Sequence, residues 1–342
     1  PVQSITESRQ NAITRAVEKV SNSVVGINVI QVKEYHRRYY TNDQFFQFFL
    51  PFAPIRKPVK SLGSGFIIDR DGYVVTNEHV VQNAIEIKVT LTDGSQHDAD
   101  LIGADEISDI ALLKLRGFKN VQPIKFHAEK DLIIGEWVIA LGNPFGLFDL
   151  NAKPTVTVGV ISSLNQNFGK MEDRVYKDMI QTDASINQGN SGGPLVNSLG
   201  EVIGMNTFIF SGDSQGSIGL GFAIPAYRIL EIVAELRTYG KVNRNYWTGI
   251  TLGEISRSVA RYLGLTPVRG VIVTDVQEDS PADKAGIQVY DVILAVNDQQ
   301  ISNRQAILDL IENSDLRGGD TLDFKIYRDR RIFTIPIRLE KL

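Results

Sequence analysis

The chain has 342 residues, a length that predicts roughly two domains. Its 36 Lys and Arg against 40 Asp and Glu give a formal net charge of −4, which argues against a general nucleic-acid binder because such proteins carry a basic excess. Cysteine is absent, so a disulfide scaffold, a zinc–thiolate site and a cysteine nucleophile are excluded. No run approaches 18 uninterrupted apolar residues, so no segment is predicted to span a bilayer.

The chain begins with a predicted helix over residues 5–20, whose apolar positions recur at helical spacing, and a strand follows from residue 23. The next segment, residues 33–60, contains three prolines and a dense aromatic run that includes Phe45, Phe46, Phe48 and Phe49. A loop of this length inside a compact domain is usually functional or disordered. Two interpretations stay open for it, a regulatory loop that reaches a neighbouring subunit and an ordinary surface insertion.

Residues 63–222 consist of short β-branched runs separated by glycine-rich turns, a pattern that favours a β-barrel or a β-sandwich. A helix over 225–239 is predicted to close this first domain, which covers residues 1–240. Residues 241–248 form a polar connector. Residues 249–342 are predicted to be a smaller domain of strands and two helices, the second helix spanning 302–313 with Ser302 as a candidate N-cap.

A glycine-flanked serine is the strongest local signal, in Gly189-Asn190-Ser191-Gly192-Gly193. Such a turn can expose a hydroxyl and aim backbone N–H groups at one point, although the same residues also make an ordinary β-turn. A serine nucleophile needs a base, and the chain has four histidines. His79 stands out because it directly follows an apolar strand, whereas the other three lie among polar or charged residues.

The base in turn needs a carboxylate to orient it, and Asp109 directly precedes the apolar run Ile110–Leu113. An aspartate before a strand is most often a turn or cap residue. The order His79, Asp109, Ser191 is nevertheless that of the chymotrypsin-type triad, and the spacing suits two barrels with the site in the cleft between them.

These motifs resemble the HtrA/Deg family of serine proteases. The resemblance rests on GSGFII from Gly63, YVVTNEHVV around His79, SDIALL around Asp109, ALGNPFG from Ala140, TDASINQGNSGGPL around Ser191 and GLGFAIP from Gly219. It implies a mostly β protein, with a chymotrypsin-like double β-barrel protease domain followed by an α+β PDZ domain. It also implies an oxyanion hole at Gly189, Asn190 and Ser191.

The resemblance implies further site residues in the first domain. Ile186, Ile218 and Leu220 would line a small apolar specificity pocket, which predicts cleavage after small aliphatic residues. The same three residues could equally be ordinary core. Arg174 would relay peptide signals in a regulatory loop, with an ordinary surface arginine as the alternative.

In the second domain, the run Arg261-Tyr262-Leu263-Gly264-Leu265 resembles the PDZ loop that binds a peptide carboxylate. The strand that contains Val271, Ile272 and Val273 is then the candidate edge to which a peptide adds, and helix 302–313 would form the other wall of the groove.

The function implied is a serine endopeptidase that degrades unfolded or misfolded proteins in an extracytoplasmic compartment such as the bacterial periplasm. C-terminal peptides at the PDZ domain would regulate it, and homotrimers or multiples of trimers are expected. A site-specific sensor protease and a peptide-binding chaperone stay open as alternatives. Histidine pairs at ligand spacing and phosphate loops are absent, so no metal or cofactor is predicted.

Overall fold

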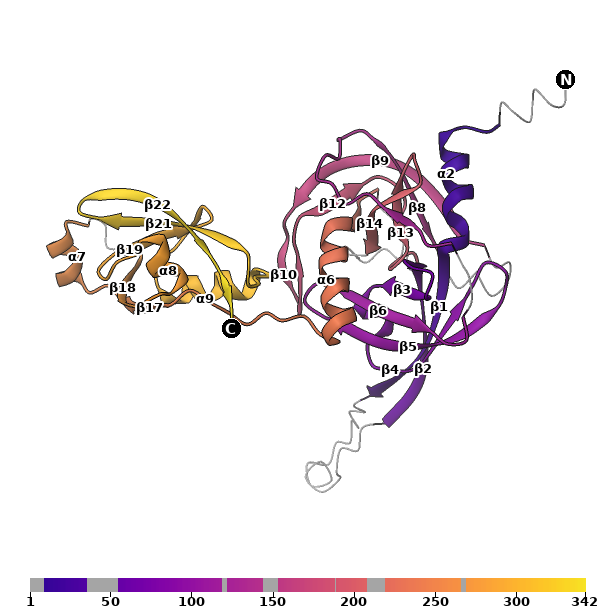
Figure 1. Cartoon of the computed structure of the whole chain (residues 1–342), viewed down its shortest axis with the longest axis horizontal. Coiled ribbons are helices and arrows are strands. Elements are labelled where there is room, and N and C mark those ends of the chain that lie inside the picture. Colours follow the sequence, from indigo (N-terminus) through magenta and orange to yellow (C-terminus); the bar gives the residue numbers. More distant parts are fainter. Residues whose placement is uncertain are drawn as a thin grey trace, which may run out of the picture. The chain divides into compact units, whose positions relative to one another are not determined.

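The computed structural model describes residues 9–35, 55–118, 122–143, 153–187, 189–207, 219–265 and 269–342. The chain forms two compact units (Figure 1). The first comprises Pro1–Asn167 and Tyr176–Lys241, and the second comprises Phe168–Val175 and Val242–Leu342. Within the described ranges, no helix is long and apolar enough to cross a membrane.

The first unit begins with a closed six-stranded antiparallel barrel. Its strands follow the order β1 (Val24–Tyr35), β2 (Ile55–Ile67), β3 (Tyr73–Thr76), β6 (Ile110–Leu115), β5 (Gln96–Asp105) and β4 (Ala84–Thr90). Alternate apolar side chains of these strands point inward, as the period of two requires, and pack into one cluster with Ile27, Val74 and Leu113 among its members. The sequence pattern left a sandwich open, and the structure shows a barrel.

A second barrel follows in the same unit. Its strands follow the order β13 (Pro194–Asn197), β8 (Trp137–Gly142), β9 (Thr155–Gln166), β12 (Met179–Thr182), β15 (Gly221–Pro225) and β14 (Glu201–Thr207), and the pairing of β13 with β14 closes the ring. The two-residue strand β7 (Lys125–Phe126) adds to β14 in parallel. The predicted double-barrel fold is therefore confirmed.

The helices of the first unit cover the barrels and connect their strands. Helix α2 (Ala12–Val20) begins with a capping box between Asn11 and Thr14, and the 3₁₀ turn η1 (Ser21–Ser23) follows it. The short helix α4 (Glu78–Val81) follows β3, and α6 (Ala226–Tyr239) packs against β5, β6 and β14. Gly240 ends α6 in the left-handed conformation, which agrees with the predicted end of this helix at residue 239.

The second unit is built on a sheet of order β17 (Ile250–Glu254), β18 (Val271–Val276), β19 (Val292–Val296), β21 (Thr321–Arg328) and β22 (Arg331–Arg338), with β20 (Gln299–Gln300) paired to β19. Strands β16 (Tyr246–Trp247) and β23 (Glu340–Lys341) pair separately, so part of the predicted connector belongs to this unit. The unit also holds the hairpin strands β10 (Gly169–Met171) and β11 (Arg174–Tyr176).

Among the described residues of the second unit, three helices complete the fold, namely α7 (Arg257–Leu263), α8 (Pro281–Ala285) and α9 (Arg304–Asn313). The N-cap of α9 is Asn303, whose side chain accepts a hydrogen bond from the N–H of Ala306, and not Ser302 as predicted. Asparagine caps a helix as well as serine does, so the neighbouring residue could take the position.

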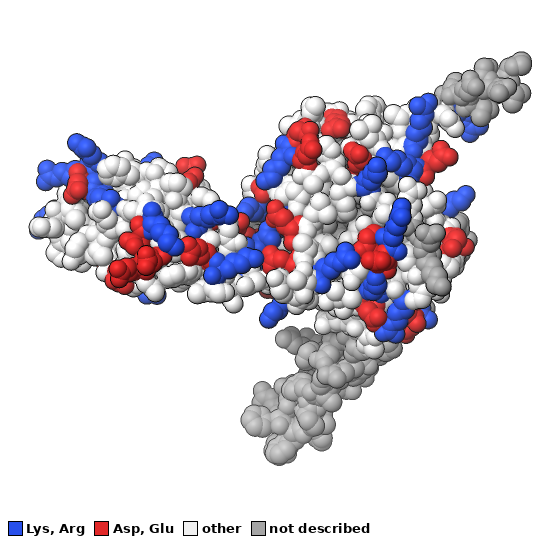
Figure 2. Space-filling model, in the orientation of Figure 1, with Lys and Arg blue, Asp and Glu red and all other residues white. Residues whose placement is uncertain are grey.

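Charged side chains are mixed over the surface. Figure 2 shows Lys and Arg interspersed with Asp and Glu across the visible face of each unit. This mixing agrees with the small net charge.

Candidate active site

His79 lies on α4, directly after strand β3 of the first barrel. Thr76 ends the strand and Asn77 is the N-cap of α4, and both are fully buried and hydrogen-bonded. Thr76 Oγ1 donates to the carbonyl of Ser64 at 2.7 Å, and Asn77 Nδ2 donates to the carbonyl of Asp109 at 3.0 Å. These contacts fix the backbone from which the imidazole of His79 projects.

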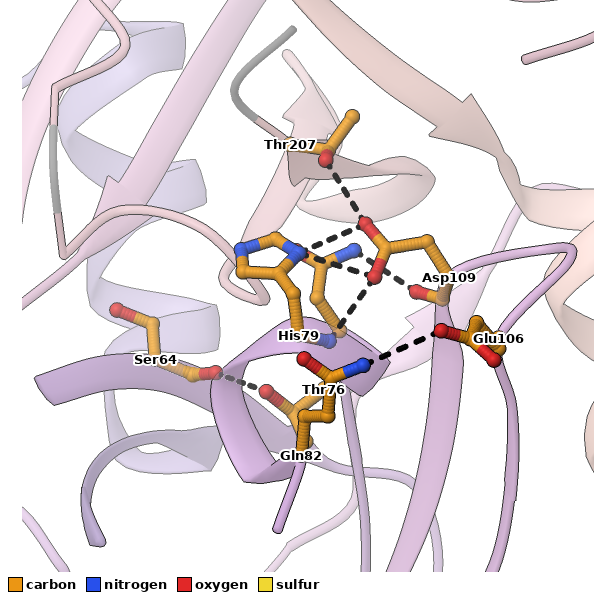
Figure 3. A network of polar contacts seen from close by, with 8 residues as sticks. Ser64, Thr76, His79, Gln82, Glu106, Asp109 and Thr207 are labelled. Carbon is orange, nitrogen blue, oxygen red and sulfur yellow. Dashed lines mark hydrogen bonds and ion pairs between the residues drawn. The ribbon is translucent and has the colours of Figure 1, made fainter. Parts of the chain in front are cut away.

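Asp109 is the last residue before β6 and is completely buried, with a positive φ of 58° that aspartate tolerates better than most residues. Its carboxylate accepts from the backbone N–H of His79 at 3.1 Å and lies 2.9 Å from His79 Nδ1 through both oxygens. Thr207 Oγ1 donates to Oδ2 at 3.2 Å (Figure 3). The contacts of both carboxylate oxygens with Nδ1 fit the tautomer in which Nδ1 carries the proton and donates to Asp109, so that Nε2 is the acceptor nitrogen of the ring.

Ser191 lies in the turn before β13 and is 6% exposed. Its carbonyl accepts from the N–H of Ser64 at 2.9 Å, and Ser64 is also the residue whose carbonyl Thr76 contacts. A Cβ added to Gly192 would lie 2.2 Å from the Ser64 carbonyl oxygen, so only glycine permits this close approach. Ser64 therefore joins the serine turn to the strand end that carries His79.

The backbone N–H groups of the turn that carries Ser191 differ in their hydrogen bonding. Within the described residues, the N–H groups of Gly189 and Ser191 have no backbone acceptor. The N–H of Asn190 donates to the carbonyl of Asn187 at 2.9 Å, so it is used inside the turn. Asn190 was predicted to share in the oxyanion hole, and this hydrogen bond contradicts that part of the prediction.

The predicted pocket residues differ in their surroundings. Ile186 is 2% exposed and packs in the core cluster of the second barrel, next to the position where β15 begins at Gly221. Leu220, the residue before β15, is 47% exposed. Ile218 lies outside the described residues.

The predicted regulatory residues are only partly described. Arg174 is the half-buried first residue of β11. Phe45, Phe46, Phe48 and Phe49 lie outside the described residues.

Two PDZ expectations are wrong. The strand of Val271, Ile272 and Val273 is β18, which lies between β17 and β19 and has no free edge. The predicted carboxylate loop is the end of α7, where the N–H of Gly264 donates to Arg261 at 3.1 Å and that of Leu265 to Ala260 at 2.8 Å. Both N–H groups are used to cap the helix, a common role for a Gly after a helix, so they cannot cradle a carboxylate.

The two barrels with this site define a trypsin-like protease domain, and the second unit is a PDZ domain. Family models agree, since the trypsin-like peptidase domain matches residues 63–205 and the PDZ domain matches residues 246–339. The chain is similar in sequence to DegP-like periplasmic serine endoproteases. The one from Chlamydia muridarum is 41% identical over 89% of this chain and 60% of its own length, and that from Ectopseudomonas mendocina is 43% identical over 84% and 59%.

Solved structures are similar over nearly the whole chain. The HtrA-type protease AlgW with a decapeptide is 32% identical, covers 97% of this chain and 98% of its own, and has a TM-score of 0.62. The serine endoprotease from Yersinia pestis is 31% identical, with 97% and 98% coverage and a TM-score of 0.55. The chain belongs to the HtrA-type protease family. It spans about 60% of the length of the curated relatives that it matches.

Ser64, Asn77 and Thr207 support the site, and the sequence interpretation did not single them out. Ser64 and Asn77 lie inside the motifs around Gly63 and His79. A polar residue next to an apolar strand is the feature of the sequence that could have indicated their supporting role. Thr207 ends β14, almost 100 residues from Asp109, and no local pattern in the sequence connects the two.

Replacing Ser64 by Ala tests this support. Ser64 is fully buried, and its Oγ donates to the Gly189 carbonyl at 2.5 Å and accepts from the N–H of Asn143 at 2.7 Å. Ser64→Ala removes this hydroxyl and leaves the Gly189 carbonyl and the Asn143 N–H without that hydrogen bond. We therefore expect the free energy of unfolding to fall by about 1–3 kcal/mol. We also expect kcat to fall about tenfold, because the peptide at Gly189 loses its anchor and one oxyanion donor is worth 100-fold or more.

The matched control for this test is Ser61→Ala, three residues earlier on β2. Urea unfolding and peptide hydrolysis measure the two effects. An unchanged kcat in Ser64→Ala would show that this hydroxyl has only a structural role.

Proposed function

We propose that this protein is a serine endopeptidase that hydrolyses unfolded proteins through His79, Asp109 and Ser191. The observation that carries the proposal is the buried Asp109 carboxylate on His79 Nδ1, in the same hydrogen-bonded network as the Ser191 turn. The names of the relatives support the hydrolase class and favour the periplasm as its compartment. Assembly into homotrimers stays a prediction, which light scattering of the purified chain would test.

The proposed reaction begins when Ser191 Oγ attacks the scissile carbonyl carbon and its proton passes to His79 Nε2. The carbonyl oxygen becomes an oxyanion, which accepts hydrogen bonds from the N–H groups of Gly189 and Ser191. Asp109 stabilises the imidazolium. The imidazolium then protonates the leaving amine, which leaves an acyl-enzyme, and a water activated by His79 hydrolyses the ester and regenerates the hydroxyl.

The substrate pocket follows from the same proposal. Ile186, Ile218 and Leu220 would give it an apolar lining, which suits a small aliphatic side chain before the scissile bond. Peptides with Val or Ala at that position are expected to be cleaved faster than a matched Lys peptide. Equal cleavage rates for the Val, Ala and Lys peptides would contradict the proposed apolar pocket.

A labelling experiment tests the proposed nucleophile directly. A fluorophosphonate probe phosphonylates an activated serine, and mass spectrometry locates the modified residue. We expect one label per chain at Ser191, together with digestion of unfolded casein. Labelling elsewhere, or none in protein that digests casein, would contradict the proposed mechanism. Labelling without casein digestion would favour the site-specific sensor protease.

We further propose that the PDZ unit binds C-terminal peptides along β17 rather than β18. β17 is the edge of the sheet, and α9 contacts it, with the N–H of Arg304 donating to Glu254 Oε1 at 3.2 Å. Leu308 and Ile311 lie on the same helical face as Arg304, at 42% and 40% exposed. An edge strand beside an exposed apolar helix face suits a peptide that adds as a strand and places a side chain against the helix.

Leu308→Glu is therefore expected to weaken binding of an apolar C-terminal peptide at least tenfold, because it removes apolar contact and adds a charge. Ile332→Glu is the control, since Ile332 is 53% exposed on β22 at the opposite edge of the sheet. Fluorescence anisotropy with a labelled peptide measures both. Equal losses in the two variants would reject the β17 groove, and so would an unchanged affinity in Leu308→Glu.

A further inference from the structure

A second cluster of chemically active side chains follows strand β7 of the second barrel. His127, Glu129 and Asp131 alternate along the chain, and one ligand atom from each lies within 4.8 Å of the other two. The backbone here is held in place, because β7 pairs with β14 and the N–H of His127 donates to the carbonyl of Val202 at 2.9 Å. None of these residues belongs to the proposed triad or to the peptide groove.

The imidazole of His127 lies between carboxylates on both ring nitrogens. Nε2 is 2.7 Å from Asp131 Oδ1, and Nδ1 is 3.7 Å from Glu201 Oε2 on β14. A histidine that binds a metal through one nitrogen commonly directs the other N–H to a carboxylate, which fixes the ring and its tautomer. Glu201 lies on the Nδ1 side of the ring at an ion-pair distance that exceeds hydrogen-bond length, so it would take that supporting role after a small side-chain movement.

The local charge favours a cation. Glu129, Asp131 and Glu201 surround one imidazole, so carboxylates outnumber it three to one. The lysine between the two ligand carboxylates, Lys130, places its ammonium over the ring of Tyr227, 4.2 Å from the centroid. This contact holds the ammonium at the aromatic ring. Lys130 also lines the adjoining cavity, so it offsets one of the three carboxylate charges.

A cavity adjoins the cluster and supplies the independent sign of a ligand site. It has a volume of about 190 Å³, and polar and apolar side chains both line it. The polar ones are His127, Glu129, Lys130, Asn165, Asp178 and Tyr227, and the apolar ones include Leu132, Ile180 and Ile203. Three protein ligands leave at least one coordination position open, and a cavity at the site gives water or a small anion room to fill it.

We propose that His127 Nε2 and the carboxylates of Glu129 and Asp131 bind a first-row divalent transition metal ion of the Zn²⁺ type, with Glu201 orienting the imidazole through Nδ1. An imidazole in the ligand set favours Zn²⁺, Ni²⁺ or Co²⁺ over Mg²⁺ and Ca²⁺, which prefer oxygen alone. The ion takes the place of the Nε2 proton, and the Nδ1 proton stays directed at Glu201. The sequence pattern did not indicate this site, because its one histidine is followed by carboxylates and not by a second histidine at ligand spacing.

Calorimetric titration of the untagged, metal-free chain of residues 1–342 with ZnCl₂ tests the proposal, and CoCl₂ adds a visible absorption band that reports the coordination number. We expect one ion per chain, no detectable binding of Mg²⁺ at the same concentration, and loss of binding in His127→Ala. Asp131→Asn serves as a second variant, because the Asp131 side chain is 64% exposed and its replacement is compatible with folding.

Three further variants make the test specific. Glu201→Gln is expected to weaken Zn²⁺ binding about tenfold, the effect of losing a supporting carboxylate. His97→Ala and His79→Ala are expected to bind as the parent does, His97 being a half-buried histidine on β5 with Ser95 as its partner. No binding by the parent, undiminished binding in both His127→Ala and Asp131→Asn, or loss in His79→Ala would each overturn the proposal.

Discussion

Replacing Ser191 by Ala is expected to lower kcat for casein or peptide hydrolysis by about a million-fold, the effect of removing the nucleophile from a serine protease triad. KM is expected to stay close to that of the parent, because the hydroxyl acts in the bond-making step and contributes little to ground-state binding. The unfolding midpoint is also expected to be unchanged, since the hydrogen bond between Ser191 and Ser64 uses the backbone carbonyl, which alanine retains.

Ser198→Ala is the matched control, a half-buried serine in the turn between β13 and β14. Hydrolysis and fluorophosphonate labelling are measured on both variants, with circular dichroism to compare their folds. Residual hydrolysis by Ser191→Ala above one thousandth of the parental rate would mean that another group is the nucleophile. Suppression of client aggregation by the same inactive variant would support a chaperone activity beside proteolysis.

The short strands of the first unit were predictable because alternation and glycine turns are local features, but that pattern alone allowed a barrel or a sandwich. The double barrel was predicted from the family resemblance, and the order of His79, Asp109 and Ser191 suggested how two such barrels share a site. The contacts that close each barrel could not be predicted from local sequence patterns. The pairing of β13 with β14 and the contact of Thr207 with Asp109 join distant segments, and such contacts depend on tertiary packing.

The PDZ domain was predicted correctly, but its peptide-binding residues were not, because the same sequence pattern fits two structural roles. Val271, Ile272 and Val273 are all buried, and a continuous apolar run is typical of an interior strand, whereas an edge strand alternates. The run that ends in Gly264 and Leu265 was interpreted as an anion cradle, yet a glycine after a helical segment more often ends the helix. The observed hydrogen bonds therefore agree with an interior strand at residues 271–273 and with a helix end at Gly264 and Leu265.

Asp109→Asn isolates the contribution of the buried carboxylate and is expected to lower kcat about 10⁴-fold with little change in KM. An amide can donate to Nδ1 of His79, which moves the ring proton to Nε2, and a protonated Nε2 cannot accept the proton of Ser191. The same amide keeps an oxygen for the backbone N–H of His79, so the fold is expected to persist.

Glu106→Gln is the control for this charge removal. Glu106 is an exposed residue three positions before Asp109, and it contacts Gln82 at 3.2 Å rather than the imidazole. The rate of fluorophosphonate labelling is expected to fall with kcat in Asp109→Asn and to stay at the parental value in Glu106→Gln. If Asp109 sets the tautomer of His79, neutralising it must slow the first proton transfer. A fall in kcat of less than tenfold in Asp109→Asn would therefore mean that the carboxylate only supports the fold.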